Sequence, residues 1–162
     1  MRIKSNYLLY NGIKYKCSIG NGGFSNKKKE RDGCTPIGVF QVTDILYRAD
    51  KLKNIVTNYN LQTISPSDGW CDDPSSKYYN TKIKFPFTNS AEELFRPDDR
   101  YDIVCVTSHN QNPIISGAGS AIFIHVASEN YSATAGCISL NLKDLTEILS
   151  TLTKTSELYF GL

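Results

Sequence analysis

Short runs of β-branched and aromatic residues alternate with turn residues along most of the chain, and this pattern predicts a mainly β protein. The dipeptide Asn11-Gly12 stands between the first two runs and is typical of a tight hairpin turn. The runs with strand character are Tyr7–Tyr10, Tyr15–Ile19, Val39–Ile45, Ile103–Thr107 and Ala121–Ala127.

Helical spacing occurs in two places. From Leu142 to Leu152 apolar residues recur every three or four positions, and Asn141 stands where an N-cap belongs. The stretch Ser90–Phe95 predicts a second, short helix, because Ser90 would cap it and two glutamates would suit the positive end of the helix dipole. The expected fold is therefore mainly β, with a C-terminal helix and one or two short helices.

The region from residue 54 to residue 87 lacks a regular hydrophobic period. It is polar, aromatic and proline-containing, which predicts a long insertion or lid. The 162 residues are enough for one hydrophobic core, so a single domain over residues 1–162 is expected.

Charge and hydropathy exclude some partners. Lysine and arginine number 18 against 16 acidic residues, and the dense basic run Lys27–Lys29 ends at Glu30, as in a solvated loop. Nucleic-acid binding is therefore not expected. No run of about 18 apolar residues is present, so we expect no membrane span.

Cysteine usage indicates a reducing compartment. The five cysteines are an odd number without a CxxC spacing, which argues against a disulfide framework and a zinc site. The segment Met1–Tyr10 lacks the apolar stretch of a secretory signal. We expect a cytoplasmic protein, or a periplasmic one only if a signal has been removed from this chain.

Candidate chemistry lies at His125 and Cys137, which are twelve residues apart. An imidazole that takes the proton of a thiol supplies a nucleophilic thiolate. In a strand, alternate side chains share a face, so Phe123 and His125 would point one way and Ile124 the other. A buried histidine and an inert buried cysteine remain alternatives. The preceding Gly136 favours catalysis, because glycine lets main-chain amides approach a substrate carbonyl.

Two motifs carry a family resemblance. The segment from His125 to Thr134-Ala-Gly-Cys-Ile138, preceded by Gly119-Ser-Ala-Ile-Phe-Ile124, resembles the active-site segment of the YkuD-type L,D-transpeptidases. The stretch Glu30-Arg-Asp-Gly-Cys-Thr-Pro-Ile-Gly-Val-Phe40 is similar to a second family motif. The resemblance implies a β-sandwich of the L,D-transpeptidase catalytic type. It also implies peptidoglycan stem peptides or muropeptides as substrates. No cofactor or metal is expected, because a thiol and an imidazole suffice for this chemistry and the sequence has no cluster of metal ligands.

The resemblance also assigns roles to particular residues. Cys137 would be the nucleophile and His125 its base, oriented by a main-chain carbonyl near Val126. The amides of Gly136 and Cys137 would hold the oxyanion, and Thr134 would place a hydroxyl near the thiolate.

The chain departs from the family pattern at two positions. Ala135 stands where many members have histidine, and Ser139 stands where many have an arginine that contacts substrate. Another cation would then have to bind a terminal carboxylate. Arg48 is favoured because it lies in the matching stretch Tyr47-Arg-Ala-Asp50, with Arg96 and Arg31 as alternatives.

Several other residues have a structural and a functional interpretation. Trp70 either packs the long loop or forms an aromatic rim for substrate, and Ser139 is a second candidate substrate contact. Asp72 and Asp73 could orient an amine or hold a metal, although Asx turns are favoured. His109 is expected to be structural or exposed. The remaining cysteines are expected to be core thiols, namely Cys17, Cys34, Cys71 and Cys105.

The stretches Tyr47–Asp50, Asp68–Pro74 and Tyr79-Asn80 are similar to a branch of compact, signal-less proteins that act inside the cell as L,D-carboxypeptidases. The resemblance therefore implies release of terminal D-alanine from stem tetrapeptides through a thioester. Transpeptidation, a non-catalytic peptide-binding module and a general thiol protease remain rival interpretations. The sequence does not indicate the oligomeric state.

Overall fold

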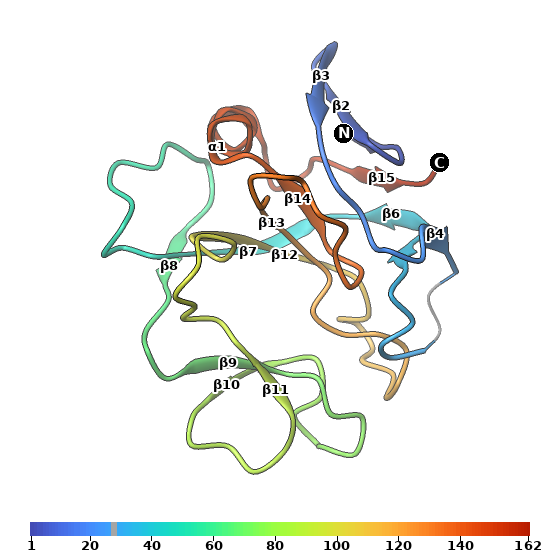
Figure 1. Cartoon of the computed structure of the whole chain (residues 1–162), viewed down its shortest axis with the longest axis vertical. Helices are drawn as coiled ribbons and strands as arrows, with labels where there is room; N and C mark the ends of the chain where they lie inside the picture. Colours follow the sequence, from blue (N-terminus) through green and yellow to red (C-terminus); the bar gives the residue numbers. More distant parts are fainter. Residues whose placement is uncertain (27–28) are drawn as a thin grey trace.

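The computed structural model describes residues 1–26 and 29–162, so Lys27 and Lys28 of the predicted basic loop lie outside the described residues. Figure 1 shows short strands and a helix near the C-terminus, α1 (Leu142–Thr151). The strands are β1 (Arg2–Ile3), β2 (Tyr7–Tyr10), β3 (Ile13–Lys16), β4 (Phe24–Ser25), β5 (Thr35–Pro36), β6 (Gly38–Phe40), β7 (Val42–Tyr47), β8 (Leu61–Thr63), β9 (Asp68–Cys71), β10 (Lys82–Lys84), β11 (Ala91–Glu93), β12 (Ile103–Thr107), β13 (Phe123–Val126), β14 (Ile138–Leu140) and β15 (Leu158–Phe160).

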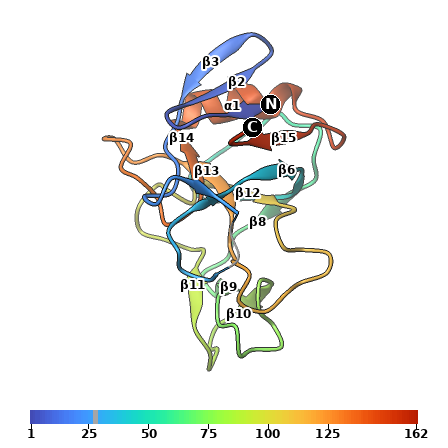
Figure 2. The same cartoon turned by 90° about the vertical axis from the view of Figure 1, so that its right-hand side faces the viewer.

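The strands form several sheets, which confirms the predicted mainly β class with a C-terminal helix. The central sheet has the order β14-β13-β12-β7-β8, and a second five-stranded sheet has the order β3-β2-β1-β15-β6. Smaller sheets are β10-β9-β11 and the pair β4-β5. In Figures 1 and 2, α1 and the hairpin β2-β3 lie at one end of the molecule, and β9, β10 and β11 lie at the other.

The central sheet separates two apolar clusters, and strand β13 contributes to both. Ile122, Ile124 and Val126 join the cluster that includes α1, whereas Ala121 and Phe123 join the other. The alternation predicted for this stretch is confirmed, although the strand itself is shorter than residues 121–127. The second cluster also contains Cys137, so the alternation directs the face of β13 that carries Phe123 toward the cysteine.

The predicted helix and hairpin are confirmed. The side chain of Asn141 accepts a hydrogen bond from the main-chain N–H of Asp144 at 2.8 Å and caps α1, whose buried residues are Leu145, Ile148 and Leu149. Between β2 and β3, Asn11 and Gly12 have φ values of 49° and 80°, as a primed hairpin turn requires.

Three local predictions are wrong. The stretch Ser90–Phe95 is not a helix, because β11 pairs with β9, and six residues are too few for an isolated helix. The stretch Val39–Ile45 is divided between β6 and β7, which belong to different sheets. The strand expected at residues 15–19 is β3, which begins and ends earlier.

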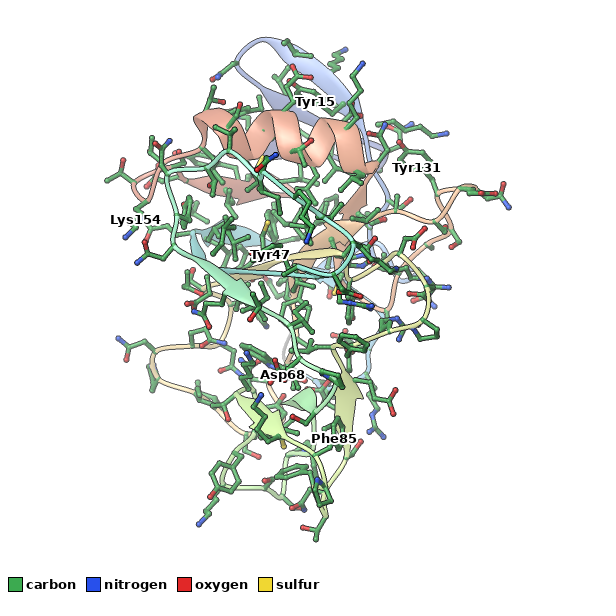
Figure 3. All side chains as sticks on the ribbon, turned by 90° about the vertical axis from the view of Figure 1, so that its left-hand side faces the viewer. Tyr15, Tyr47, Asp68, Phe85, Tyr131 and Lys154 are labelled. Carbon is green, nitrogen blue, oxygen red and sulfur yellow. The ribbon has the colours of Figure 1, made fainter. Side chains whose placement is uncertain are left out.

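The region 54–87, predicted to be a long insertion or lid, contains the regular strands β8, β9 and β10. The carboxylate of Asp68 lies 3.2 Å from Lys82 Nζ and 2.6 Å from Lys84 Nζ, so β9 and β10 are joined by ion pairs as well as by main-chain bonds. Figure 3 shows Asp68 and Phe85 in this outlying part. Gly69 is required there, since a Cβ would lie 2.6 Å from the Phe85 ring.

Within the described residues, no helix has the length and apolar character needed to cross a lipid bilayer.

Candidate active site

Cys137 and His125 line one cavity of about 310 Å³. Strands β13 and β14 are parallel neighbours in which Ile124 is paired with Ile138 and His125 with Ser139. Cys137 immediately precedes β14, so the strand register sets it beside the start of β13. The pairing of two strands therefore brings together residues that are twelve positions apart.

The main chain at the start of β13 fixes the position of the thiol. Cys137 Sγ lies 3.1 Å from the carbonyl oxygen of Ala121 and 3.4 Å from the N–H of Phe123. The thiol donates to the first group and the sulfur accepts from the second. The residue is 8% exposed, so a substrate must reach the sulfur through the cavity.

His125 is held as a neutral base. Its Nδ1 lies 2.8 Å from the carbonyl oxygen of Val126, so Nδ1–H donates there and Nε2 carries the lone pair. Burial lowers the pKa of His125 to about 4. The edge of the Tyr101 ring packs against the imidazole, with ring centroids 5.3 Å apart. At neutral pH the imidazole is therefore uncharged, and it lines the same cavity as Cys137.

The turn before the nucleophile is closed by Thr134. Its hydroxyl donates to the carbonyl of Cys137 at 2.6 Å and accepts from the N–H of Gly136 at 3.1 Å. In this arrangement the N–H of Gly136, a predicted oxyanion donor, is engaged by the Thr134 hydroxyl, and that hydroxyl bonds main-chain groups on both sides of the turn. Gly136 has a φ of 142°, which glycine adopts without strain, so its role is conformational.

Thr35 joins the two sequence motifs. This fully buried residue donates its hydroxyl hydrogen to the carbonyl of Gly136 and accepts from the N–H of Gly20, both at 2.9 Å. Gly20 allows this close packing, because a Cβ there would lie 2.3 Å from the carbonyl oxygen of Gly33. The second motif therefore supports the turn that carries the nucleophile.

Replacing Thr35 with valine is expected to lower the free energy of unfolding by about 2 to 4 kcal/mol, because two buried main-chain groups lose their partner. Urea denaturation would measure the change. Thr43→Val is the control, because this half-exposed hydroxyl has only a 3.4 Å bond to Val106 and should change stability by less than about 0.5 kcal/mol. Equal effects of the two substitutions would contradict the supporting role of Thr35.

Comparison with known families gives a match over almost the whole chain. The profile described as YkuD, L,D-transpeptidase catalytic domain, matches residues 4–159. The chain belongs to the YkuD family. This membership implies a cysteine enzyme of the L,D-transpeptidase type with peptidoglycan peptides as substrates. No curated protein and no solved structure gave a significant match.

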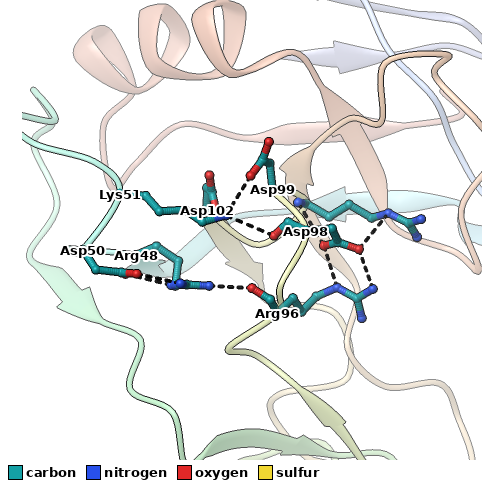
Figure 4. A network of polar contacts seen from close by, with 8 residues as sticks. Arg48, Asp50, Lys51, Arg96, Asp98, Asp99 and Asp102 are labelled. Carbon is teal, nitrogen blue, oxygen red and sulfur yellow. Dashed lines mark hydrogen bonds and ion pairs between the residues drawn. The ribbon is translucent and has the colours of Figure 1, made fainter.

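The arginine favoured from the sequence of this YkuD domain lies outside the cavity. Arg48 is 5% exposed, and its guanidinium forms two hydrogen bonds to Asp50, at 2.8 and 2.6 Å, and one to the carbonyl of Arg96 (Figure 4). It also stacks over the Phe95 ring at 3.6 Å. Arg48 therefore does not line the cavity of Cys137, and its contacts anchor the segment before β12.

Arg96 and Arg100 line the cavity instead. Arg96 was an alternative from the sequence, and its side chain is fixed by Asp98 through bonds of 2.9 and 2.8 Å (Figure 4). Arg100 was missed, because nothing in its local pattern distinguishes it from a surface arginine. Its carbonyl accepts from the N–H of Val126 at 3.0 Å, and this contact brings Arg100 next to the strand of His125.

The two other candidate substrate contacts, Ser139 and Trp70, lie in different surroundings. Ser139 lines the cavity opposite His125 in the strand register. Trp70 is not at a groove rim, since it is buried, packs edge-on against Phe123 at 5.1 Å and donates its indole N–H to Asn80 at 3.0 Å. Trp70 therefore packs the second cluster.

The other cysteines differ from Cys137 in their surroundings. Burial raises the pKa of Cys17 and Cys105 to about 12, which makes both thiols poor nucleophiles. Cys71 is buried as well, whereas Cys34 is only half-buried and is not a core thiol. His109 has a structural contact, because its ring packs edge-on against Phe40 at 5.6 Å.

Proposed function

We propose that this YkuD domain is an L,D-carboxypeptidase that releases the terminal D-alanine from peptidoglycan stem tetrapeptides. The proposal rests on one observation: the cavity that holds Cys137 and neutral His125 also carries Arg96 and Arg100. A thiol and a base supply covalent catalysis, and the arginines supply the positive charge that a terminal carboxylate requires.

In the proposed reaction, His125 Nε2 takes the proton of Cys137, and the sulfur attacks the carbonyl carbon of the third stem residue. A C–S bond forms and the carbonyl oxygen becomes an oxyanion, for which the main-chain N–H of Cys137 is the proposed donor. The oxyanion collapses, the C–N bond breaks, and His125 returns the proton to the amine of D-alanine. A thioester of the tripeptide remains.

Water completes the proposed cycle. His125 removes a proton from a water molecule that attacks the thioester, the C–S bond breaks, and the thiolate regains its proton. The products are the tripeptide carboxylate and free D-alanine. An amine that replaced this water would give a crosslinked peptide, which is the outcome of a transpeptidase.

Mass spectrometry of a stem tetrapeptide incubated with the protein tests the proposal. Loss of D-alanine supports it, and a dimeric product would indicate transpeptidation instead. A matched tetrapeptide with terminal L-alanine is the stereochemical control, because its cleavage at an equal rate would indicate a general thiol protease. An unchanged tetrapeptide would favour a peptide-binding module. The cytoplasmic location stays a prediction, which cell fractionation would test.

Replacing Arg100 with glutamine is expected to raise KM about tenfold and to change kcat less than threefold. The Arg100 side chain is half-exposed and only loosely paired with Asp98 at 3.5 Å, so it can turn toward a carboxylate. Loss of one partly solvated charge-assisted bond corresponds to about 1.4 kcal/mol. Steady-state assays of D-alanine release would measure both constants. Arg2→Gln, on the N-terminal sheet, is the control, and an equal effect there would refute a specific contact.

A further inference from the structure

Ala121 has an unusual main-chain conformation beside the nucleophile. Its φ is 51°, in the left-handed region, although it is not glycine, and it is 5% exposed. This conformation costs free energy for a residue that has a Cβ, so the surrounding structure must hold it. The carbonyl of Ala121 accepts the hydrogen bond from Cys137 Sγ at 3.1 Å. The strained residue is therefore the one that aims an acceptor at the thiol.

The N–H of Ala121 is held by a second side chain, that of Asn80. Asn80 Oδ1 accepts from this N–H at 3.1 Å. Ala121 thus has Asn80 on its N–H and Cys137 on its carbonyl, and one residue connects the two side chains. Asn80 does not line the cavity that holds Cys137 and His125, so it acts on the sulfur through Ala121 and not by contact with substrate.

Asn80 is itself fixed at both ends of its amide. The residue is 1% exposed, and its Oδ1 accepts a second bond, from the indole N–H of Trp70 at 3.0 Å. Its Nδ2 donates to the carbonyls of His109 and Asn110, at 3.3 and 2.8 Å. An amide side chain has two acceptor positions and two N–H donors, and all four are used here. The amide therefore has one orientation, which fixes where the N–H of Ala121 lies.

The main chain of Asn80 suits this position. Its φ is 56°, a left-handed value that asparagine adopts more readily than most residues do. Its N–H donates to the carbonyl of Cys71 at 2.9 Å, and its carbonyl accepts from Gln111 Nε2 at 3.4 Å. Cys71 ends β9, so Asn80 is anchored to the outlying sheet β10-β9-β11. That sheet is therefore linked to the nucleophile by a short series of bonds, from Asn80 to Ala121 to Cys137.

We infer that Asn80 is a positioning residue for the nucleophile. It holds Ala121 in the left-handed conformation, and the Ala121 carbonyl then accepts the thiol proton in a hydrogen bond while the N–H of Phe123 contacts the sulfur. Resting on the proposed function, this arrangement places the sulfur for attack on the carbonyl of the bound peptide. The turn between β9 and β10 thereby takes part in the geometry of the active site.

Loss of the Asn80 side chain has two opposite expected effects. Without its oxygen, Ala121 relaxes to a negative φ and its carbonyl no longer faces the sulfur. A thiol that donates to a carbonyl is stabilised in its protonated form, so loss of this acceptor favours the thiolate, which is the form that iodoacetamide alkylates. Turnover depends instead on placement of the sulfur against the bound peptide, and a displacement of about 1 Å can cost about 100-fold.

The test is alkylation with iodoacetamide, resolved for each cysteine by peptide mass spectrometry. In Asn80→Gly, which adopts the left-handed main chain without strain, Cys137 is expected to react about fivefold faster, as loss of one hydrogen bond predicts. The core thiols Cys17 and Cys105 are buried and should react as slowly as in the wild-type protein. For D-alanine release, kcat of the variant should fall about 10- to 100-fold and KM should change less than threefold.

Two further variants separate positioning from loss of stability. Asn80→Asp keeps an acceptor oxygen for Ala121 and, in its protonated form, one donor, so it should restore most of the wild-type alkylation rate at Cys137. Asn110→Gly is the matched control, because Asn110 also has a left-handed φ, of 51°, and its side chain bonds main-chain groups of the loop 115–119 rather than Ala121. It should change the Cys137 rate less than twofold. Urea denaturation would show how far each variant is destabilised.

Each outcome has a defined meaning. An unchanged Cys137 rate or a wild-type kcat in Asn80→Gly, an equal rise at Cys17 and Cys105, or an equal effect of Asn110→Gly would overturn the inference. If Asn80→Gly does not fold, Asn80→Asp decides. A Cys137 rate near that of the wild type in this less stable variant supports the role of the oxygen, and a changed rate overturns it. If the wild-type protein releases no D-alanine, only the proposed carboxypeptidase activity falls, because the alkylation rates do not depend on substrate.

Discussion

Cys137→Ala is expected to lower kcat/KM for D-alanine release by about 10⁴-fold or more, because the variant has no atom that can form the thioester. The fold should persist, since the change removes only one sulfur atom from a residue that lines the active-site cavity. Release of D-alanine, followed by mass spectrometry, gives the rate.

Cys34→Ala is the matched control for the nucleophile. Cys34 is half-buried and belongs to the second motif, but it does not line the cavity that holds Cys137 and His125. Its replacement should change the rate less than threefold. A wild-type rate in Cys137→Ala, or an equal loss in Cys34→Ala, would rule out the assigned nucleophile. A covalent adduct of one tripeptide acyl group on Cys137, found after rapid acid quenching of the wild-type protein, would identify the thioester directly.

His125→Asn is expected to lower kcat by about 10³-fold, because the variant keeps a side-chain N–H for the carbonyl of Val126 but has no base at the position of Nε2. The same variant should also change how stability depends on pH. Unfolded histidine has a pKa of about 6.5, whereas burial lowers the pKa of His125 to about 4 in the folded protein.

The sign of the pH effect follows from this difference. Below pH 6.5 the unfolded chain binds a proton that the folded protein does not, so the free energy of unfolding falls as the pH falls toward 4. A shift of this size corresponds to about 3 kcal/mol. Urea denaturation at pH 7 and pH 4.5 should therefore show a larger loss for the wild-type protein than for His125→Asn. Equal losses in the two proteins would contradict the buried, neutral state of His125.

The parts of the fold that were predictable from the sequence are those with local signals. The alternation through Ile122, Phe123 and Ile124 predicted which residues face each cluster, and Asn141 predicted the start of α1. The sheet β10-β9-β11 has no such signal, because its strands have three or four residues and β9 is buried at every position. Burial on both faces removes the alternation on which a strand prediction depends.

The candidate site was predictable where residue type implies chemistry and not where position depends on tertiary contacts. Cys137 and His125 could be paired from the sequence. The sequence could not indicate which arginine lines the cavity. Arg48 is held away from it by contacts with Asp50 and Phe95, whereas Arg100 is placed beside it by a main-chain hydrogen bond to Val126. The sequence indicated that Gly136 lies in the turn before the cysteine, but it could not indicate that the N–H of Gly136 donates a hydrogen bond to the Thr134 hydroxyl.

The bond between Thr35 and Gly136 joins residues 101 positions apart, and this separation affects how the protein folds. Contacts between distant residues require closure of a long loop, so they form more slowly than local turns. A nascent or partly folded chain therefore has the cysteine in a loop that is not yet anchored. The turn that carries Cys137 is therefore complete only when the segments around Thr35 and Gly136 have met, and the folding of the second motif is a precondition for the geometry of the thiol.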